Sequence, residues 1–390
     1  MSRTAAPANP APPAPDAPHK LDTATLSQWQ LIRLRFSRHH LAVWSLFFLG
    51  ILYAVALFAP FLAPYERNSK NFDYTYAPPM LPRVSLSDGL HVYGMDRHTD
   101  PLNLKTYYVE NRDRVVPLGF FVRGDDYSFL GLFRTDVHFF GVNQTRFEAR
   151  GYEGDFAEPV FFLLGADRFG HCIFSRILYA SQVSLSIGLI SIVISFVLGI
   201  FIGGVSGYYG GGIDNFIQRS IEVLNSFPSL PLWMALAAIM PPTWSPLTVY
   251  FAITVVLSLF GWTGLARVVR GKILSLREED YAVAARLLGA SHGRIIFKHL
   301  VPGFTSHIIV TLTLSVPAMI LGETALSFLG IGLRPPVVSW GVMLQDCMNI
   351  DVVANYPWLL MPVIFIVLTV LAFNFLGDGL RDAADPYASR

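Results

Sequence analysis

Long apolar stretches alternate with polar stretches along the chain, and this pattern predicts six membrane-spanning helices. The hydrocarbon core of a bilayer is about 30 Å thick and needs about 20 apolar residues of helix to cross it. Strands of a membrane barrel would be shorter and would alternate apolar with polar residues. The runs here are long and continuous, which predicts an all-α membrane bundle with spans at residues 41–64, 183–209, 214–240, 247–266, 304–328 and 357–377.

Two of the predicted spans carry signals about packing. The third contains Pro228 and Pro231, which remove backbone donors and are expected to kink it. Small residues let membrane helices approach closely, so we expect the second span inside the bundle. That span holds Gly188, Gly199, Gly203, Gly204 and Gly207.

A long polar region, residues 65–163, separates the first two spans and is too long for a simple loop. Strand-like segments at 115–122, 127–133 and 137–142 flank turn-like segments at 124–126 and 134–136. These patterns predict a small, β-rich external domain. Its aromatic residues either form its own core or present an interface for an external protein; they include Phe120, Phe121, Tyr127, Phe129, Phe139 and Phe140.

Positive charge next to the spans predicts the orientation of the chain. Arg33, Arg35 and Arg38 precede the first span, and the loop at 267–303 has a further excess of Lys and Arg. Short loops rich in these residues stay in the cytoplasm, so both termini are expected there. The predicted divisions are a disordered Ala- and Pro-rich tail at 1–27, a basic segment and first span at 28–64, the external domain at 65–163 and the remaining spans at 164–386.

Composition narrows the classes of function. Hydrophobic residues make up 53% of the 390 residues and charged residues 15%, against about 25% charged in a soluble domain. A net charge of +1 gives no sign of a nucleic-acid partner, and Cys172 and Cys347 make neither a disulfide framework nor a metal site. The sequence has no Gly-x-x-x-x-Gly-Lys-Ser/Thr phosphate-binding loop. Energy for any transport would therefore come from a separate subunit or from an ion gradient.

The loop at 267–303 contains signals for two short helices. Ser275 followed by Glu278 is a capping-box pattern, which predicts that a helix begins there. Gly289 is expected to end that helix, because glycine is favoured just past a helix C-terminus. Ser291 is then placed to cap a second short helix.

The first of these helices has an apolar face. Tyr281, Ala285 and Leu288 fall at helical spacing on one side of it. The helix is too short to span a membrane, and this face is too apolar for a free loop. Two interpretations stay open: the face docks into a groove of another protein, or it lies on the lipid headgroups.

Residues 280–291, with Pro302 after them, resemble the "EAA" loop of ABC importer permeases. In that family the loop forms a coupling helix that docks into a cleft of a cytoplasmic ATPase. Val283 stands where the family has its glutamate, so an ion pair to the ATPase is either absent or comes from Glu279 or Asp280. The resemblance implies a coupling surface made of Glu279, Asp280, Tyr281, Ala284, Ala285, Leu288, Gly289, Ala290 and Ser291.

Two further strings are similar to the C-type permease subunits of dipeptide and oligopeptide importers. Residues 164–185 open with Leu-Gly-Ala-Asp-Arg-Phe-Gly, although His171-Cys172 replaces the Arg-Asp of that family. Residues 323–341 open with Glu-Thr-Ala-Leu-Ser-Phe-Leu-Gly. The likeness covers about residues 164–386. It implies the six-helix bundle of type I ABC importers and a role in importing di- or oligopeptides or similar small solutes.

The same resemblance implies partners and a location. The partners are a second, different permease subunit, two cytoplasmic ABC ATPase subunits or domains that bind ATP and Mg, and an extracytoplasmic substrate-binding protein. The location is the bacterial inner membrane, with its lipid around the bundle. The resemblance implies no catalytic residue, cofactor or metal in this chain. The expected mechanism is alternating access, in which ATP closes the ATPases and the bundle opens outward.

Four residues are candidates for a gate or a substrate path. Glu323 is a lone acid late in the fifth span, with Ser327 one turn on, and an acid inside a membrane is a candidate functional group. It would contact the amino terminus of a peptide, hold the outer gate, or pair with a basic residue of a partner subunit. Arg219 and Glu222 lie three residues apart near the inner end of the third span, in the path or as a structural ion pair.

Two other classes of membrane protein stay open as alternatives. An ATP-independent secondary transporter usually shows internal repeats and buried charges, neither of which is evident here. A membrane-embedded enzyme would need a cluster of acids or histidines inside the spans, which are nearly free of them. Copurification with an ATPase that carries a phosphate-binding loop would separate the importer from both.

Overall fold

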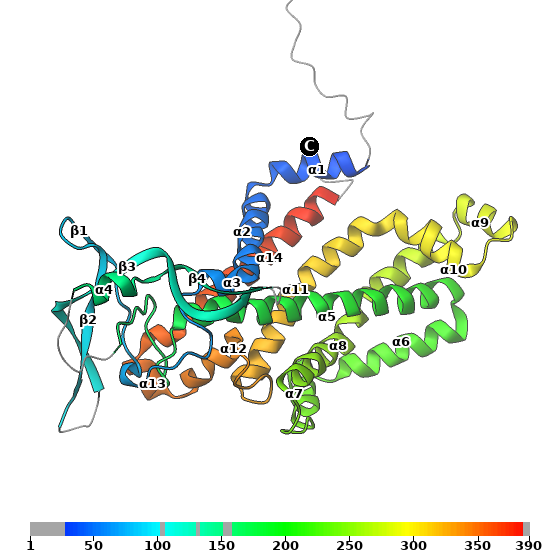
Figure 1. Ribbon diagram of the computed structural model, residues 1–390. Coiled ribbons are helices and arrows are strands. Elements are labelled where there is room, and N and C mark those ends of the chain that lie inside the picture. Colours follow the sequence, from blue (N-terminus) through cyan, green and yellow to red (C-terminus); the bar gives the residue numbers. More distant parts are fainter. Residues whose placement is uncertain (1–27, 102–105, 130–132, 151–157, 385–390) are drawn as a thin grey trace, which may run out of the picture.

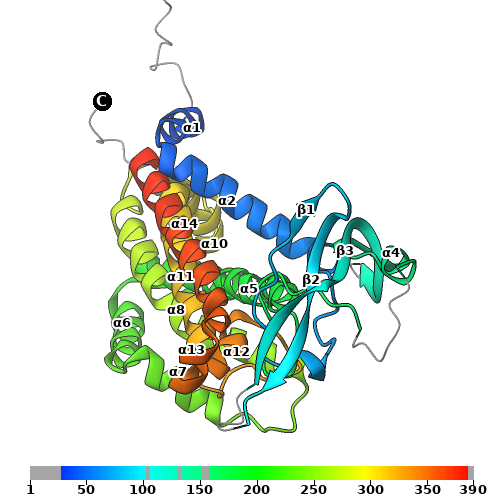
Figure 2. The ribbon, with the colours of Figure 1, turned by 90° about the vertical axis from the view of Figure 1, so that its left-hand side faces the viewer.

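The chain folds into a bundle of long helices with a small sheet at one end (Figures 1 and 2). The computed structural model describes residues 28–101, 106–129, 133–150 and 158–384, so the predicted tail at 1–27 lies outside it. Within that part of the chain, five helices are long and apolar enough to cross a membrane. The predicted helical membrane bundle is confirmed, with α2 (His40–Leu57), α5 (Ile173–Tyr209), α8 (Pro246–Leu276), α11 (Thr305–Phe328) and α14 (Met361–Ala384).

The third predicted span differs from the expectation, because it is a pair of helices. Helix α6 (Gly211–Ser226) ends before an extended Phe227, with φ −87° and ψ 135°, and α7 (Ser229–Ala238) begins after Pro228. The residue before a proline avoids the helical region, since the proline ring crowds its backbone. Pro228 therefore breaks the helix where a kink was predicted.

Helices α5 and α8 approach closely through the glycines of the second span. A Cβ added to Gly203 would lie 2.4 Å from the carbonyl oxygen of Ala266, and one added to Gly207 would lie 2.7 Å from that of Arg270. Further along the same helix–helix contact, Ser258 Oγ donates a hydrogen bond to the carbonyl oxygen of Ser191 at 3.3 Å. Small residues thus place the two backbones together, as the sequence predicts.

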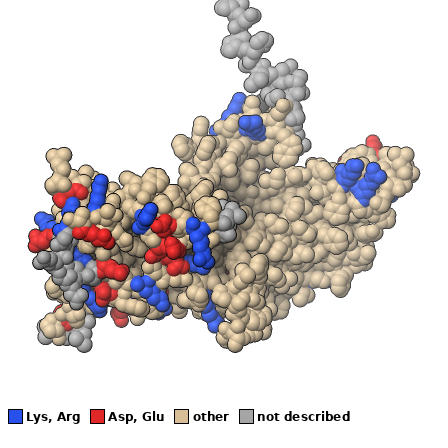
Figure 3. Space-filling view, viewed as in Figure 1, with Lys and Arg blue, Asp and Glu red and all other residues tan. Residues whose placement is uncertain are grey.

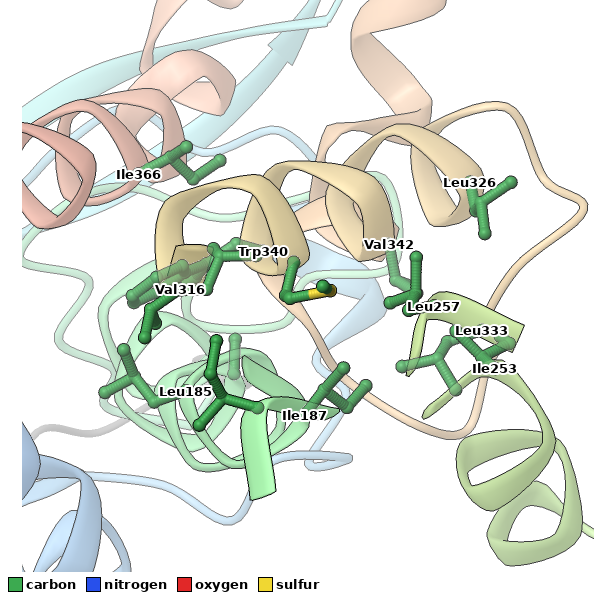
Figure 4. Packing of buried hydrophobic residues seen from close by; sticks show 14 of the residues in the cluster. Leu185, Ile187, Ile253, Leu257, Val316, Leu326, Leu333, Trp340, Val342 and Ile366 are labelled. Carbon is green, nitrogen blue, oxygen red and sulfur yellow. The ribbon is translucent and has the colours of Figure 1, made fainter. Parts of the chain in front are cut away.

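The main core lies where α5, α8, α11 and α14 meet (Figure 4). Trp340 is completely buried in it, and its indole nitrogen donates to the carbonyl oxygen of Ile177 at 3.3 Å. Trp340 begins α12 (Trp340–Met343), a short helix in the segment between α11 and α14. That segment therefore closes one end of the bundle, and it also contains α13 (Ile350–Asn355).

The external region contains an antiparallel sheet of four strands in the order β1-β2-β3-β4. The strands are β1 (Arg83–Ser85), β2 (Gly89–Thr99), β3 (Thr106–Phe129) and β4 (Phe133–Val142). A separate core of buried residues, among them Val92, Val116 and Phe161, lies beneath it. The prediction of a small β-rich insertion is confirmed.

The strand boundaries inside this region were predicted wrongly. Residues 124–126 are not a turn but a shift of register within β3, between Arg123 and Tyr127, and residues 134–136 lie inside β4. Strands β1 and β2 were not predicted. Polar residues are held in this ladder by cross-strand pairing, which a local pattern does not show. Residues 130–132 of the predicted strand 127–133 lie outside the described residues.

Short helices connect these parts. Helix α1 (Gln28–Arg38) carries the predicted basic segment, α3 (Ala59–Leu62) follows the first span, and α4 (Gln144–Glu148) follows the sheet. In the face shown in Figure 3, charged side chains gather over the sheet and at the far ends near α1 and α9 (Asp280–Leu287), and a broad band between them is almost free of charge. Such a band is what a lipid bilayer requires of the surface that it covers.

Candidate functional site

The predicted coupling loop projects from the end of α8, at the opposite end of the bundle from the sheet (Figure 1). Helix α8 continues to Leu276, well beyond the predicted end of the fourth span, and α9 covers Asp280–Leu287. Ser275 lies in the last turn of α8, so the predicted capping box at Ser275 and Glu278 is wrong. Glu279 is the N-cap residue of α9, and its side chain makes no capping hydrogen bond. Helix α8 leaves the membrane and continues as long as its backbone hydrogen bonds are satisfied. The N-cap of the next helix therefore lies after the predicted position.

The end of α9 agrees with the prediction. Gly289 has a φ of +79°, the left-handed conformation that glycine adopts without strain. The backbone N–H of Ala290 reaches back to the carbonyl oxygen of Ala285 at 3.0 Å, as in a Schellman motif. Ser291 then caps α10 (His292–Arg294) by accepting from the N–H of Arg294 at 3.4 Å. The two short helices are therefore joined by a sharply defined turn.

The inner side of this turn is anchored in a core of its own. Ala282 of α9 is 3% exposed, and Ile295 and Ile296, which follow α10, are 1% and 3% exposed. They belong to the same buried cluster as Val269 and Ile273 of α8. The loop is thus packed on the inner end of the bundle rather than hanging free.

The outer side of the turn is apolar and uncovered. Leu287 is 82% exposed and Leu288 is 88% exposed, and Tyr281 at the start of α9 is 46% exposed. Of the predicted face, Tyr281 and Leu288 are exposed and Ala285 is half-buried. Burying a leucine side chain is worth about 1.5–3 kcal/mol, so this surface gains most when a partner covers it. Leu287 was missed because it lies one residue off the predicted helical face.

The other predicted coupling residues surround this apolar patch. Asp280 lies in the first turn of α9 and Arg286 in the last, charges that suit the dipole of the helix. Val283, which stands where the resembling family has a glutamate, is half-buried. The remaining predicted residues divide between exposed Glu279, Ala284, Gly289 and Ser291 and half-buried Ala290.

Polar contacts tie the loop to neighbouring helices. Arg277 donates from Nη1 to the carbonyl oxygens of Gly207 and Tyr208, both at 3.1 Å, at the end of α5. The hydroxyl of Tyr209 lies 3.1 Å from Nδ1 of His292. These contacts attach the loop to the end of α5.

The candidate gate residues form two separate pairs. Glu323 is completely buried and accepts hydrogen bonds from Ser184 Oγ at 3.2 Å and from Ser327 Oγ at 2.8 Å. Arg219 and Glu222, on α6, form an exposed ion pair with 2.6 Å between Nη1 and Oε2. The structure therefore brings Glu323 to Ser327 and Arg219 to Glu222, on different helices.

Comparison with known proteins gives matches over most of the chain. The family described as binding-protein-dependent transport system inner membrane component matches residues 195–390. The N-terminal transmembrane domain of oligopeptide transport permease C matches residues 27–79. The two matched regions leave out the whole of the external sheet, which lies between Arg83 and Val142.

Individual relatives give the same picture. The dipeptide transport system permease protein of Bacillus subtilis is 42% identical over 58% of this chain and 69% of its own length. The oligopeptide transport system permease protein of the same organism is 38% identical, over 57% of this chain and 70% of its own length. A glutathione transport system permease protein of Pectobacterium atrosepticum is 40% identical, over 57% of this chain and 72% of its own length.

Members of this family are the membrane components of their transporters, and a separate subunit supplies the ATPase. The apolar spans of this chain and the lack of a phosphate-binding loop in its sequence agree with that division. The chain therefore belongs to the binding-protein-dependent transport system inner membrane components, the multi-pass, non-catalytic permease subunits of ABC importers.

Proposed function

We propose that this permease imports di- or oligopeptides, or similar small solutes, which a binding protein delivers from outside. The support comes from the relatives, whose names refer to transport of dipeptides, oligopeptides and glutathione. Glutathione is itself a small peptide, so the shared chemistry is a short peptide backbone with charged ends. The similarity extends through the core, where the predicted path would lie.

The observation that carries the proposed mechanism is the exposure of Leu287 and Leu288 on an otherwise anchored loop. We infer that this patch, with Tyr281 and the other predicted coupling residues, docks into a groove of the ATPase subunit. That subunit binds ATP and Mg, and closure of two such subunits moves α9 toward the bundle. The contacts of Arg277 with the end of α5 then pass the movement on to the spans.

The proposed assembly contains a second, different permease subunit, two ATPases and the external binding protein. Both termini and α9 lie in the cytoplasm, which agrees with the Lys and Arg side chains near α1 and α9 in Figure 3. The working units are residues 28–64 as the basic segment and first span, 65–163 as the external insertion and 164–386 as the permease core.

For the gate, we propose that Glu323 and Ser327 hold the outer part of the path closed. Support comes from their burial and from Ser184, which donates to Glu323 and accepts from the N–H of Trp340 at 3.2 Å. This contact joins α5, α11 and α12 at one point. Arg219 and Glu222, which are exposed on α6, are proposed to line the inner part of the path.

Reconstitution tests the proposed function. The permease, its partner permease and the ATPases are placed in proteoliposomes, and uptake of a labelled dipeptide is measured with binding protein on the sheet side. Uptake is expected only with ATP on the α9 side, and it should stop when the ATPase subunits are omitted. Uptake driven by an ion gradient without any ATPase would establish a secondary transporter instead.

A further inference from the structure

Two neighbouring groups of phenylalanine rings join the external sheet to the end of the first span. Phe61 of α3 lies 6.2 Å from Phe121 and 5.8 Å from Phe139, measured between ring centroids. Phe58, next to the end of α2, lies 5.7 Å from Phe129. The aromatic strip comprises Phe58, Phe61, Phe120, Phe121, Phe129, Phe133 and Phe139.

The aromatic strip is not the core of the external region. Phe120, Phe121 and Phe133 are 59%, 66% and 57% exposed. The buried residues of the region are others, among them Val92 and Phe161. Several exposed large rings in one patch are unfavourable in water and mark a surface that another apolar phase covers.

The aromatic strip continues the exposed apolar side of α2. On that helix, Phe47 and Ile51 are each 63% exposed and Leu57 is 50% exposed, while Leu49 and Leu52 face the bundle. Because α2 crosses the membrane, those of its side chains that no other part of this chain covers face the hydrocarbon core of the bilayer. Phe58 then links this side of α2 to the β3–β4 hairpin, which lies beside α3 in Figure 1.

The hairpin is fixed to the span, so the depth of the aromatic strip is fixed as well. His138 of β4 is completely buried, with Nδ1 2.5 Å from the carbonyl oxygen of Ala63 and Nε2 2.9 Å from that of Asp125. The backbone N–H of Glu66 donates to Asp125 Oδ2 at 2.9 Å. Phe121 has a φ of +54°, a strained conformation for an aromatic residue. That backbone carries its ring onto Phe61.

The hairpin also carries exposed positive charge. Arg123 is 86% exposed on its side chain, and its ion pair with Asp136 is long, at 3.8 Å. Arg134 on β4 is exposed too. Guanidinium groups bind phosphate oxygens with charge-assisted hydrogen bonds. Aromatic rings at the level of lipid headgroups, with arginine beside them, are typical of surfaces that sit in the membrane interface.

We propose that the β3–β4 hairpin lies on the membrane, with the aromatic strip among the lipid headgroups and upper acyl chains of the leaflet on the sheet side, and with Arg123 and Arg134 facing lipid phosphates. The hairpin then holds the external region against the bilayer beside the first span.

Lipid-borne quenching tests this proposal in the assembled transporter, reconstituted in phosphatidylcholine–phosphatidylglycerol nanodiscs. Cys172 is buried, so only Cys347 is replaced by alanine before single cysteines are introduced. Phe121→Cys and Phe133→Cys are labelled with bimane, and Leu86→Cys, on the loop between β1 and β2, is the control. Leu86 is fully exposed. Nitroxide is carried on the phosphatidylcholine headgroup, and iodide is the aqueous quencher.

Both strip labels are expected to lose most of their fluorescence to the nitroxide lipid and little to iodide, and the Leu86→Cys label is expected to do the reverse. The Phe133→Cys label decides the outcome if the strained position 121 does not accept the substitution. Strong iodide quenching at the strip would overturn the proposal. So would protection from both quenchers, which indicates a permease–permease contact, or protection that develops only when binding protein is added.

Discussion

Asp214 and Arg270 form a two-point ion pair between α6 and α8, with 2.5 Å from Nε to Oδ1 and 2.6 Å from Nη2 to Oδ2. Ser206 of α5 donates to the same Asp214 Oδ1 at 2.5 Å. Three helices are thus joined at one carboxylate, a short distance along α8 from the coupling loop. We infer that this junction lets the loop, α5 and α6 move as one body.

Removing the carboxylate charge should weaken this junction. Asp214→Asn leaves Arg270 with a neutral partner, and we expect it to lower the stability of the permease by about 2 kcal/mol, since hydrogen bonds to charged groups contribute about 1.5–3 kcal/mol. The measurement is the thermal denaturation midpoint in detergent. Glu222→Gln on the same helix is the matched control, because its exposed pair with Arg219 should contribute less than about 1 kcal/mol. Equal midpoints for the two variants would count against the junction.

The contact between α5 and α8 should not tolerate a methyl group at Gly203. The added carbon would lie 2.4 Å from the carbonyl oxygen of Ala266, a backbone atom that cannot move alone. Overpacking of this kind costs about 1–3 kcal/mol, so Gly203→Ala should lower the denaturation midpoint and reduce uptake. Gly264→Ala on α8 is the control, because nothing lies within 4 Å of its added carbon. A Gly203→Ala variant as stable as Gly264→Ala would show that the helices are less tightly packed.

Acid should loosen the segment that leads into α5. Asp167 accepts from the N–H of Phe169 at 2.8 Å and from His171 Nδ1 at 2.8 Å, and it also pairs with Arg176. Burial on its own would raise the pKa of Asp167, but the hydrogen bond from His171 and the charge of Arg176 hold it below the ordinary value of 3.8. Such a group stabilises the fold above its unfolded pKa, and that stabilisation is lost as the pH falls through the folded value.

We therefore expect the denaturation midpoint to fall steeply below about pH 4 in the wild-type permease. Asp167→Asn should be less stable at neutral pH, because Arg176 is left without its charged partner, and its midpoint should fall less steeply in acid. Identical acid profiles for the two proteins would show that Asp167 does not carry the effect.

The sequence was most informative where local chemistry decides the structure. Continuous apolar runs placed the long spans, and Gly289 and Ser291 marked the end of one short helix and the start of the next, because both signals act within a few residues. The glycines of α5 were equally informative, since close approach of backbones requires them wherever the partner helix lies.

Other features depend on contacts between distant residues. The end of α8 at Leu276 could not be predicted from polarity, because the helix leaves the membrane before it ends. Strand β2 exists through pairing with β3, and β1 through pairing with β2. The polar residues inside these strands make them look like loop in the sequence. The exposure of Leu287 follows from Ile295 and Ile296, which fill the inner side of the turn and leave the helix end uncovered.

If the exposed leucines dock into the ATPase, replacing them should separate the two subunits. Leu287→Glu and Leu288→Glu place a charge in the proposed ATPase groove, while Leu86→Glu makes the same change at a fully exposed leucine in the loop between β1 and β2. Each leucine buried on docking contributes about 1.5–3 kcal/mol. The amount of ATPase that copurifies with each loop variant should therefore fall by a factor of about ten or more, and ATP-driven peptide uptake should fall in proportion. Leu86→Glu should match the wild type in both measurements. Loop variants that fold normally and keep both the ATPase and full uptake would show that the leucines do not couple the permease to its ATPase.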